Sequence, residues 1–296
     1  VCGDSSLDRI SVLLQRMKDA NRKEDEDEDE GGLLVRIVGI PKTIDNDIPS
    51  TIFSLGFQSV VSIASQAIMP ARDTAESHRR IIVVECMGRD AGFLTLHAGL
   101  AGGADAILIP EFPLNDGEDL TQFLSHVRRA YDKDQCAVLA VAESVTLPQV
   151  QEVDVGSDTD TEETDSDRRS RAYRQTPDGS KRFGGSAEAV ASYLAKSLNV
   201  DARHIALGHL QRGGSPNAFD QVLATTLGAH AVKTICSSGD NDKIKNGGFV
   251  TWNGENVEVV PLENVSGVPS KAVTAEYPEF VAAEVMGIYC GGRTER

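Results

Sequence analysis

The stretch RIIVVECMGRDAGFLTLHAGLAGGADAILIPE (80–111) contains an apolar run, a segment rich in small and apolar residues, and a second apolar run. The two runs (80–88 and 104–111) are short and show no clean alternation of apolar and polar residues. This pattern is typical of strands that are buried on both faces of a parallel sheet. The segment between them, 91–102, is long enough for a helix. The order strand, helix, strand predicts one unit of an α/β fold.

The same pattern recurs along the chain. Apolar runs predict three more strands, at LLVRIVGIP (33–41), CAVLAVAE (136–143) and HIALGHLQ (204–211). Helices are predicted at about 6–20 and over 55–72, 117–133, 186–198 and 217–236. Repeated strand–helix succession predicts an α/β fold of doubly wound, mostly parallel sheets, Rossmann-like and three-layered.

The net charge of −16 is concentrated in two tracts, EDEDEDE (24–30) and EVDVGSDTDTEETDSD (152–167). We interpret these tracts as parts of acidic and polar loop insertions at 21–32 and 150–183, because blocks of like charge repel and stay solvated. The rest of the chain is nearly neutral and has no basic face, which argues against nucleic-acid binding. An acidic interaction protein is the alternative function that the two tracts leave open.

Several features bear on the cellular location of the chain. Eighteen consecutive apolar residues occur nowhere, so no membrane helix is predicted, and the start VCGDSSLDRI does not resemble a secretory signal. The five cysteines are scattered without metal-binding spacing, which favours a reducing compartment, here the cytoplasm. Because Val1 replaces an initiator Met, we expect the chain to begin partway through a longer polypeptide.

The segment PKTIDNDIPS, which starts at residue 41, has polar residues with short side chains at every second position. In an extended backbone, Thr43, Asp45 and Asp47 would share one side and the intervening residues would point away. Ligands of open α/β sheets bind beyond the carboxyl ends of strands. One carboxylate could therefore take a substrate proton while the other helps to hold a metal. A turn built on Asp and Asn is the structural alternative.

Other predicted strands also end in polar groups. Met87, Gly88 and Arg89 lie between a strand and a helix, where a helix N-terminus and a guanidinium group attract phosphate. Glu143 ends another strand and suits sugar hydroxyls. The strand edges also carry Arg80, Arg203, His209 and Arg212. Each residue alone is compatible with a structural role, but together they predict a site for a phosphorylated polyol and a metal.

Three segments, PKTIDND (41–47), ESHRRIIVVECMGRDAGFLTLHAGLAGGADAILIPE (76–111) and LGHLQRGGSPNAFDQVLA (207–224), resemble hallmark segments of the 6-phosphofructokinase family, in the family's order. The resemblance extends over 33–112 and 183–262. It implies phosphoryl transfer from ATP or pyrophosphate to the 1-hydroxyl of fructose 6-phosphate, a step of glycolysis, with Mg²⁺.

The resemblance also implies residue roles. Asp45 would be the general base, Thr43 would contact the transferring phosphoryl group, and Lys42 belongs with these catalytic residues. Arg89 would stabilise charge in the transition state. The sugar phosphate would be bound by Thr43, Asp45, Met87, Gly88, Arg89, Glu143, His209 and Arg212, and by Arg80 and Arg203 from a neighbouring subunit. Shared sites imply a homo-oligomer, a dimer or a tetramer.

VCGDSS resembles the family's Gly-Gly-Asp-Gly-Ser donor-phosphate loop, with Cys2 where a glycine is expected. The residues expected to bind the donor are Gly3, Asp4, Ser5 and Ser6, and Asp4 and Asp47 are the expected metal ligands. Ser5 also replaces a glycine; because it adds no negative charge, ATP is the expected donor. Lys42 stands where pyrophosphate enzymes carry Lys, so pyrophosphate stays the alternative.

The family's opening strand and Gly-rich phosphate turn would precede Val1, so parts of the N-terminal sheet and of the donor site are expected to be missing. A non-catalytic regulatory homologue therefore remains a second alternative. The predicted domains are a partial donor-phosphate domain, 1–56 plus 213–262, and a sugar-phosphate domain, 57–212 plus 263–296.

Overall fold

The computed structural model describes Arg16 and residues 37–115, 117–148, 173–175, 181–237 and 247–292. The predicted donor loop Gly3–Ser6, both acidic tracts and, except for Arg16, the predicted helix at 6–20 lie outside these residues. The chain divides into two compact units. The first is Val1–Ser59 with Ser215–Lys271, and the second is Val60–Gly214 with Ala272–Arg296.

The second unit is built on a four-stranded sheet whose order is β3 (Ala106–Leu108), β4 (Ala137–Ala142), β2 (Ile81–Cys86), β7 (Ala202–Ala206). All three strand pairs are parallel. Every residue of β2 and β4 is buried, as expected for apolar runs without alternation. β7 lies at one edge of the sheet, and most of its residues are exposed.

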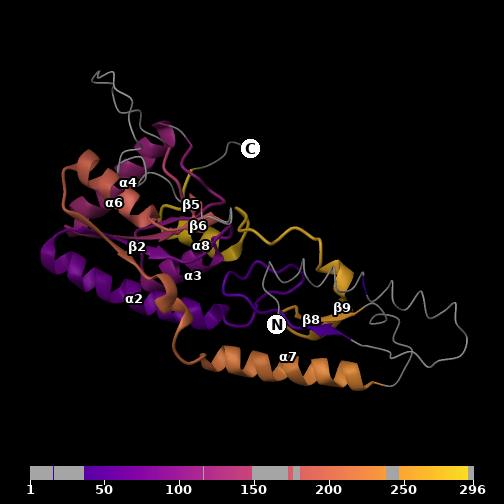
Figure 1. Cartoon of the computed structure of the whole chain (residues 1–296). Coiled ribbons are helices and arrows are strands. Elements are labelled where there is room, and N and C mark those ends of the chain that lie inside the picture. The colour runs from indigo at the N-terminus through magenta and orange to yellow at the C-terminus, as the bar shows by residue number, and fades with distance from the viewer. Residues whose placement is uncertain are drawn as a thin grey trace, which may run out of the picture. The chain divides into compact units, whose positions relative to one another are not determined.

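Helices cover both faces of this sheet (Figure 1). The helices of the second unit are α2 (Phe57–His78), which starts in the first unit, α3 (Phe93–Gly102), α4 (Gly117–Asp134), α6 (Ser186–Leu198) and α8 (Pro278–Val285). α4 and α6 pack on the face that carries Val83, Leu108 and Leu139. α3 approaches the opposite face, where Ile107 and Ala140 lie close to its backbone. The predicted doubly wound α/β fold is confirmed.

The first unit contains a three-stranded sheet in the order β1 (Val38–Gly39), β8 (Gly248–Trp252), β9 (Val257–Pro261). β1 pairs with β8 in parallel, and β8 and β9 form an antiparallel hairpin. The long helix α7 (Ala218–Cys236) packs through Leu223, Leu227 and Ala231 against Val250. β1 ends at Gly39, and the loop that carries Asp45 follows it from about Pro41.

Three element predictions need correction. The predicted strand 204–211 is wrong in its second half, because β7 ends at Ala206 and Gly208–Arg212 forms a 3-10 helix, η1. α2 runs past its predicted end at residue 72 and ends at His78. At the predicted end, the Arg72 side chain donates to the Gly103 carbonyl (2.6 Å) and to Asp105 (2.9 Å). A hairpin of β5 (Tyr173–Gln175) and β6 (Lys181–Phe183) lies within the predicted insertion 150–183.

The four described cysteines are free thiols. Cys86, Cys136 and Cys290 are buried, whereas Cys236 is exposed at the end of α7. Burial raises the pKa of Cys86 and of Cys290 to about 12. Their packing role agrees with the absence of metal-binding spacing. Within the described residues, no helix is both long and apolar enough to span a bilayer.

Candidate active site

The loop that follows β1 bends at Ile44 and Asp45 instead of continuing as a strand. The Asp45 N–H donates to Thr43 Oγ1 at 3.1 Å, and Asn46 has a positive φ of 56°. The prediction of an extended backbone is therefore wrong here. A threonine hydroxyl can accept a nearby backbone N–H, and this local hydrogen bond competes with strand pairing.

The bend still brings Thr43 and Asp45 together. Thr43 Oγ1 donates to Asp45 Oδ2 at 3.4 Å, and the Asp45 side chain is partly exposed. Asp47 is buried and interacts electrostatically with Lys271. In the first unit, the partly exposed Asp45 carboxylate thus lies beside the buried Thr43 hydroxyl, and the second carboxylate, Asp47, lies beside a cation.

Asn46 holds the loop in this shape from the inside. Its side-chain N–H donates to the Ile52 carbonyl at 3.0 Å, and its Oδ1 accepts the Ser54 N–H at 2.9 Å. The Ser54 hydroxyl then donates to the Thr43 carbonyl at 2.7 Å. Asn46 is 1% exposed. Its positive φ is in the left-handed region, which asparagine adopts more readily than most residues other than glycine. The residue pattern does not reveal that Asn46 organises the loop, although the Asp-Asn-Asp run signals a turn.

Lys271 contacts the same loop from a distant part of the sequence. Its Nζ donates to the carbonyls of Thr51 (2.8 Å) and Ile52 (3.1 Å), and its backbone N–H donates to the Asp47 carbonyl (2.7 Å). Burial lowers the pKa of Lys271 to about 8, although the nearby Asp47 carboxylate raises it. Lys271 lies in none of the sequence motifs, so its contact with this loop is visible only in the structure.

Asp220 joins the N-termini of α2 and α7. Its carboxylate accepts the N–H groups of Gly56 (3.0 Å) and Ser59 (2.7 Å) and the Ser59 hydroxyl. Asn217 caps α7 by accepting the Asp220 N–H at 2.9 Å. Asp220 therefore acts as an N-cap for a helix far away in the sequence. It lies within the quoted segment LGHLQRGGSPNAFDQVLA, but its role is structural.

In the second unit, the carboxyl ends of β2 and β4 are tied together. The Gly88 N–H donates to Glu143 Oε1 at 3.3 Å, and the Ser144 hydroxyl donates to the Gly88 carbonyl at 3.2 Å. Gly88 has φ 142°, and a Cβ there would lie 2.8 Å from the Ala91 carbonyl oxygen. Only glycine fits this turn without strain.

The turn η1 is joined to the same edge of the sheet by Gln211. Its Oε1 accepts the Met87 N–H at 3.4 Å, and the side chain is fully buried. η1 also carries His209 and Arg212, whose side chains are exposed, as is that of Arg89. The structure therefore places Met87–Arg89, Glu143 and the η1 cations after the carboxyl ends of β2, β4 and β7. His209 and Arg212 were predicted at a strand end, but they belong to the 3-10 helix η1.

Arg80 and Arg203 lie at the other end of the sheet. Arg80 precedes β2 and forms an ion pair with Asp201 at 3.3 Å, and Arg203 on β7 pairs with the same carboxylate at 3.0 Å. Because a strand rises by about 3.3 Å per residue, the seven steps from Arg80 to Met87 separate them by about 23 Å along the strand. The structure does not bring these two arginines to Arg89.

A family model described as Phosphofructokinase matches residues 1–235. The chain belongs to the phosphofructokinase family. It is 41% identical over 206 residues to the "Pyrophosphate--fructose 6-phosphate 1-phosphotransferase" of Amycolatopsis methanolica, covering 70% of this chain and 54% of that protein. It is 35% identical over 238 residues to the "ATP-dependent 6-phosphofructokinase" of Corynebacterium efficiens, covering 80% of this chain and 61% of that protein. The chain thus spans little more than half the length of these relatives.

The fold of this phosphofructokinase-family chain is also found in solved structures. The pyrophosphate-dependent phosphofructokinase of Marinobacter aquaeolei matches with a TM-score of 0.68 and 20% identity, covering 99% of this chain and 67% of that one. At this identity the likeness shows the fold alone. The parallel sheet flanked by helices is therefore the family's architecture.

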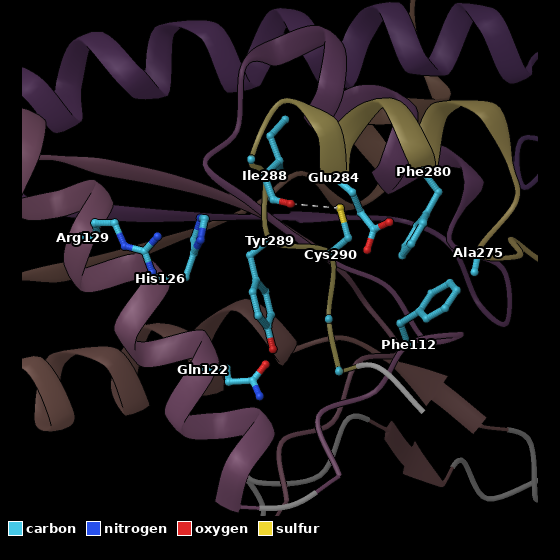
Figure 2. A pocket seen from close by; sticks show the side chains of 13 residues that line it. Phe112, Gln122, His126, Arg129, Ala275, Phe280, Glu284, Ile288, Tyr289 and Cys290 are labelled. Atoms are coloured by element: carbon cyan, nitrogen blue, oxygen red, sulfur yellow. Dashed lines mark hydrogen bonds between the residues drawn. The ribbon is translucent and has the colours of Figure 1, made fainter. Parts of the chain in front are cut away.

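A separate cavity of about 860 Å³ lies in the second unit, between α4, α8 and the segment that ends at Gly292. Figure 2 shows Arg129 and His126 on one side of Tyr289, and Phe112 and Phe280 on the other. The two phenylalanine rings stack with centroids 4.3 Å apart. None of the site residues expected for a phosphofructokinase lines this cavity.

Proposed function

We propose that this chain transfers a phosphoryl group to the 1-hydroxyl of D-fructose 6-phosphate, with Asp45 as general base. The observation that carries the proposal is the partly exposed Asp45 carboxylate beside the Thr43 hydroxyl, in a loop of a phosphofructokinase-family chain. One named relative is a pyrophosphate--fructose 6-phosphate 1-phosphotransferase, and the other is an ATP-dependent 6-phosphofructokinase. Both names support phosphoryl transfer to this sugar phosphate.

In the proposed reaction, an Asp45 oxygen accepts the proton of the sugar hydroxyl as the hydroxyl oxygen attacks the terminal phosphorus of the donor. The new O–P bond forms while the bond from that phosphorus to the donor's bridging oxygen breaks, and the shortened donor leaves. The Thr43 hydroxyl, 3.4 Å from Asp45, orients the carboxylate. Phosphoryl transfer depends mainly on positioning and charge stabilisation, which is the role of Arg89.

We assign sugar-phosphate binding to the second unit and donor binding to the first. The exposed Arg89, His209 and Arg212 supply the positive charge that a phosphate group requires. The backbone of Met87 and Gly88 and the carboxylate of Glu143 would contact the sugar. Lys42 is exposed next to Thr43, where it would reach the donor phosphates.

ATP is the donor that we propose, because Ser5 adds no charge that would repel a nucleotide. Pyrophosphate is the second candidate. It is favoured by Lys42 and by the 41% identity to a relative that is named for pyrophosphate.

Mg²⁺ would enter with the donor. Among the described residues, no three His, Cys, Asp or Glu side chains form a metal-binding group. Mg²⁺ usually binds through one or two carboxylates together with substrate phosphates and water. We propose Asp47, and Asp4 outside the described residues, as the carboxylates that would hold it; the ion would neutralise charge on the donor phosphates.

We further propose that the chain forms a homo-oligomer, a dimer or a tetramer, with shared active sites. Arg80 and Arg203 lie at the amino ends of β2 and β7, away from Arg89, and β7 is an exposed edge strand. Guanidinium groups in this place would be positioned to serve the sugar phosphate of a second copy. As a glycolytic enzyme, the protein is expected in the cytoplasm.

The test is a coupled assay of fructose 6-phosphate phosphorylation with Mg-ATP and, separately, with Mg-pyrophosphate. The Asp45→Asn variant should lower kcat by about 10²- to 10⁴-fold, because it removes the proton acceptor, while binding of the sugar phosphate persists. Activity with pyrophosphate alone would replace ATP as the donor. An Asp45→Asn variant as active as wild type, or no activity of wild type with either donor, would contradict the proposal and favour a regulatory homologue.

A further inference from the structure

The chain passes from the first unit to the second between Lys271 and Ala272. Here the crossover segment means Lys271, Ala272 and Val273. Lys271 is anchored in the first unit, and Val273 is anchored in the second. Ala272 between them is exposed.

The first anchor holds the loop that carries Asp45. Lys271 donates to three carbonyls of that loop, two through its ammonium group and one through its backbone N–H. One of these carbonyls, that of Ile52, also accepts the side chain of Asn46. Lys271 and Asn46 thus meet on one peptide group, and Asn46 directly follows Asp45. Any movement of the Lys271 side chain would be passed to the loop through this shared carbonyl.

The second anchor holds the turn that carries Arg89. The Val273 N–H donates to Glu111 Oε1 at 3.0 Å, and the same oxygen accepts the Gly92 N–H at 2.8 Å. Gly92 precedes α3 and closes the turn that starts at Gly88. A Cβ at Gly92 would lie 2.6 Å from Glu111 Oε2, so the carboxyl group is packed tightly against this backbone.

We propose that Lys271 and Glu111 are positioning residues for the phosphoryl transfer, acting at the two ends of the crossover segment. Lys271 fixes the loop that presents the general base Asp45. Glu111 fixes the turn that presents Arg89 to the sugar phosphate. This inference rests on the proposed function, because it assigns each residue to one half of that reaction. Neither residue is proposed to touch the substrate.

The separate attachments predict separate kinetic effects. Lys271→Met should lower kcat about tenfold with the KM for fructose 6-phosphate changed less than about twofold, because a displaced base slows chemistry without weakening sugar binding. Glu111→Ala should raise that KM about tenfold and change kcat less than about twofold. Lys271→Arg should recover most of kcat, because a guanidinium also donates to carbonyls. Glu111→Gln should recover KM, because its carbonyl oxygen accepts the same two N–H groups.

The matched control is Lys196→Met, which removes an exposed lysine on α6 and should leave both kinetic constants within about twofold of wild type. Equal loss of kcat and gain of KM in both test variants would indicate a general loss of folding and would overturn the assignment. Wild-type kinetics in Lys271→Met or in Glu111→Ala would overturn it as well, as would failure of the conservative variants to rescue.

Hydrogen exchange tests the anchors without reference to activity. In Lys271→Met, amides in peptides that cover residues 46–55 should exchange about tenfold faster, with those of 88–92 unchanged, and Glu111→Ala should show the reverse. Unchanged exchange at both places would exclude the positioning role. If wild type had no transferase activity while these exchange changes were present, the proposed function would fail and the anchoring contacts would stand as structural.

Discussion

Asp45 and Asp220 show how the same chemical group is used in two ways. Asp220 is 4% exposed, and its carboxylate accepts two backbone N–H groups and a hydroxyl. Asp45 is partly exposed, with the Thr43 hydroxyl 3.4 Å from its carboxylate. Burial and local donors therefore distinguish a helix cap from a candidate base, and sequence alone does not, because both residues lie in family hallmark segments.

Replacing Asp220 by Ala should lower the free energy of unfolding by about 3 kcal/mol, because the half-buried N–H group of Gly56 and the buried N–H group of Ser59 lose their acceptor. Urea unfolding measures this change. The control is Gln221→Ala on the same helix, where an exposed hydrogen bond to Pro216 is lost and the change should stay within about 0.5 kcal/mol. A loss in Asp220→Ala no larger than that of the control would contradict the capping role.

Glu111 should make stability depend on pH in the acidic range. Burial raises its pKa above the usual 4.5, although the N–H groups of Gly92 and Val273 lower it. The folded protein therefore holds the proton at pH values where the unfolded chain has released it, so this contribution to stability is present at low pH and is lost as pH rises through the folded pKa. Compared with Glu111→Gln, wild type should gain melting temperature as the pH falls from neutral, through the raised pKa of Glu111, toward the ordinary value of 4.5. A difference between the two proteins that does not vary with pH would refute this.

At the scale of elements, the apolar runs located the two central strands of the second unit well, but not the edge strand β7, which ends at Ala206. β2 and β4 differ from the predicted runs by a few residues at their ends, because burial on both faces leaves an unmistakable apolar pattern. The hairpin β8–β9 was missed although Asn253 and Gly254 form a typical turn signal between its strands. The bend at Ile44–Asp45 agrees with the turn that the Asp and Asn residues left as the alternative; the extended pattern is overridden there by a side-chain hydrogen bond.

α3 packs on the sheet through a glycine. A Cβ at Gly99 would lie 2.8 Å from Ile107 Cγ1 and 3.0 Å from Ala140 Cβ. Gly99→Ala should therefore destabilise the protein by about 1–3 kcal/mol through overpacking. Gly228→Ala in α7 is the matched control, because nothing lies within 4 Å of its added Cβ; it should stabilise by about 0.5–1 kcal/mol through helix propensity. Thermal melts of both variants would check the opposite signs, and equal signs would refute the close packing.

At the scale of the whole molecule, the chain is a phosphofructokinase-family protein that spans little more than half of its named relatives. Its candidate site residues fall into both compact units and at both ends of one sheet. The family resemblance supplied their expected roles; the structure supplied Asn46, Gln211, Glu111 and Lys271, which support them. The sequence does not reveal the roles of these four residues, because each one hydrogen-bonds to backbone groups that only the folded chain brings close to it.

The proposed sharing of active sites between subunits predicts how mixed oligomers behave. Asp45→Asn and Arg203→Ala should each be inactive alone, but subunits mixed by unfolding and refolding together should recover about a quarter of wild-type activity, because half of the random dimers are hybrids and each hybrid has one intact site. Asp45→Asn mixed with Arg89→Ala is the control and should recover nothing, because both residues belong to the same subunit's half. Recovery in the control, or none in the first mixture, would contradict sharing.

The placement of the described thiols allows unfolding of the second unit to be followed by cysteine labelling. Among the described cysteines, Cys236 faces solvent, while Cys86, Cys136 and Cys290 are enclosed. A maleimide dye would therefore modify Cys236 within the folded state, whereas Cys86 at the end of β2 and Cys136 just before β4 would become reactive only when the parallel sheet separates. Once Cys236 is blocked, the rate at which Cys86 and Cys136 are labelled measures how often the sheet of the second unit comes apart.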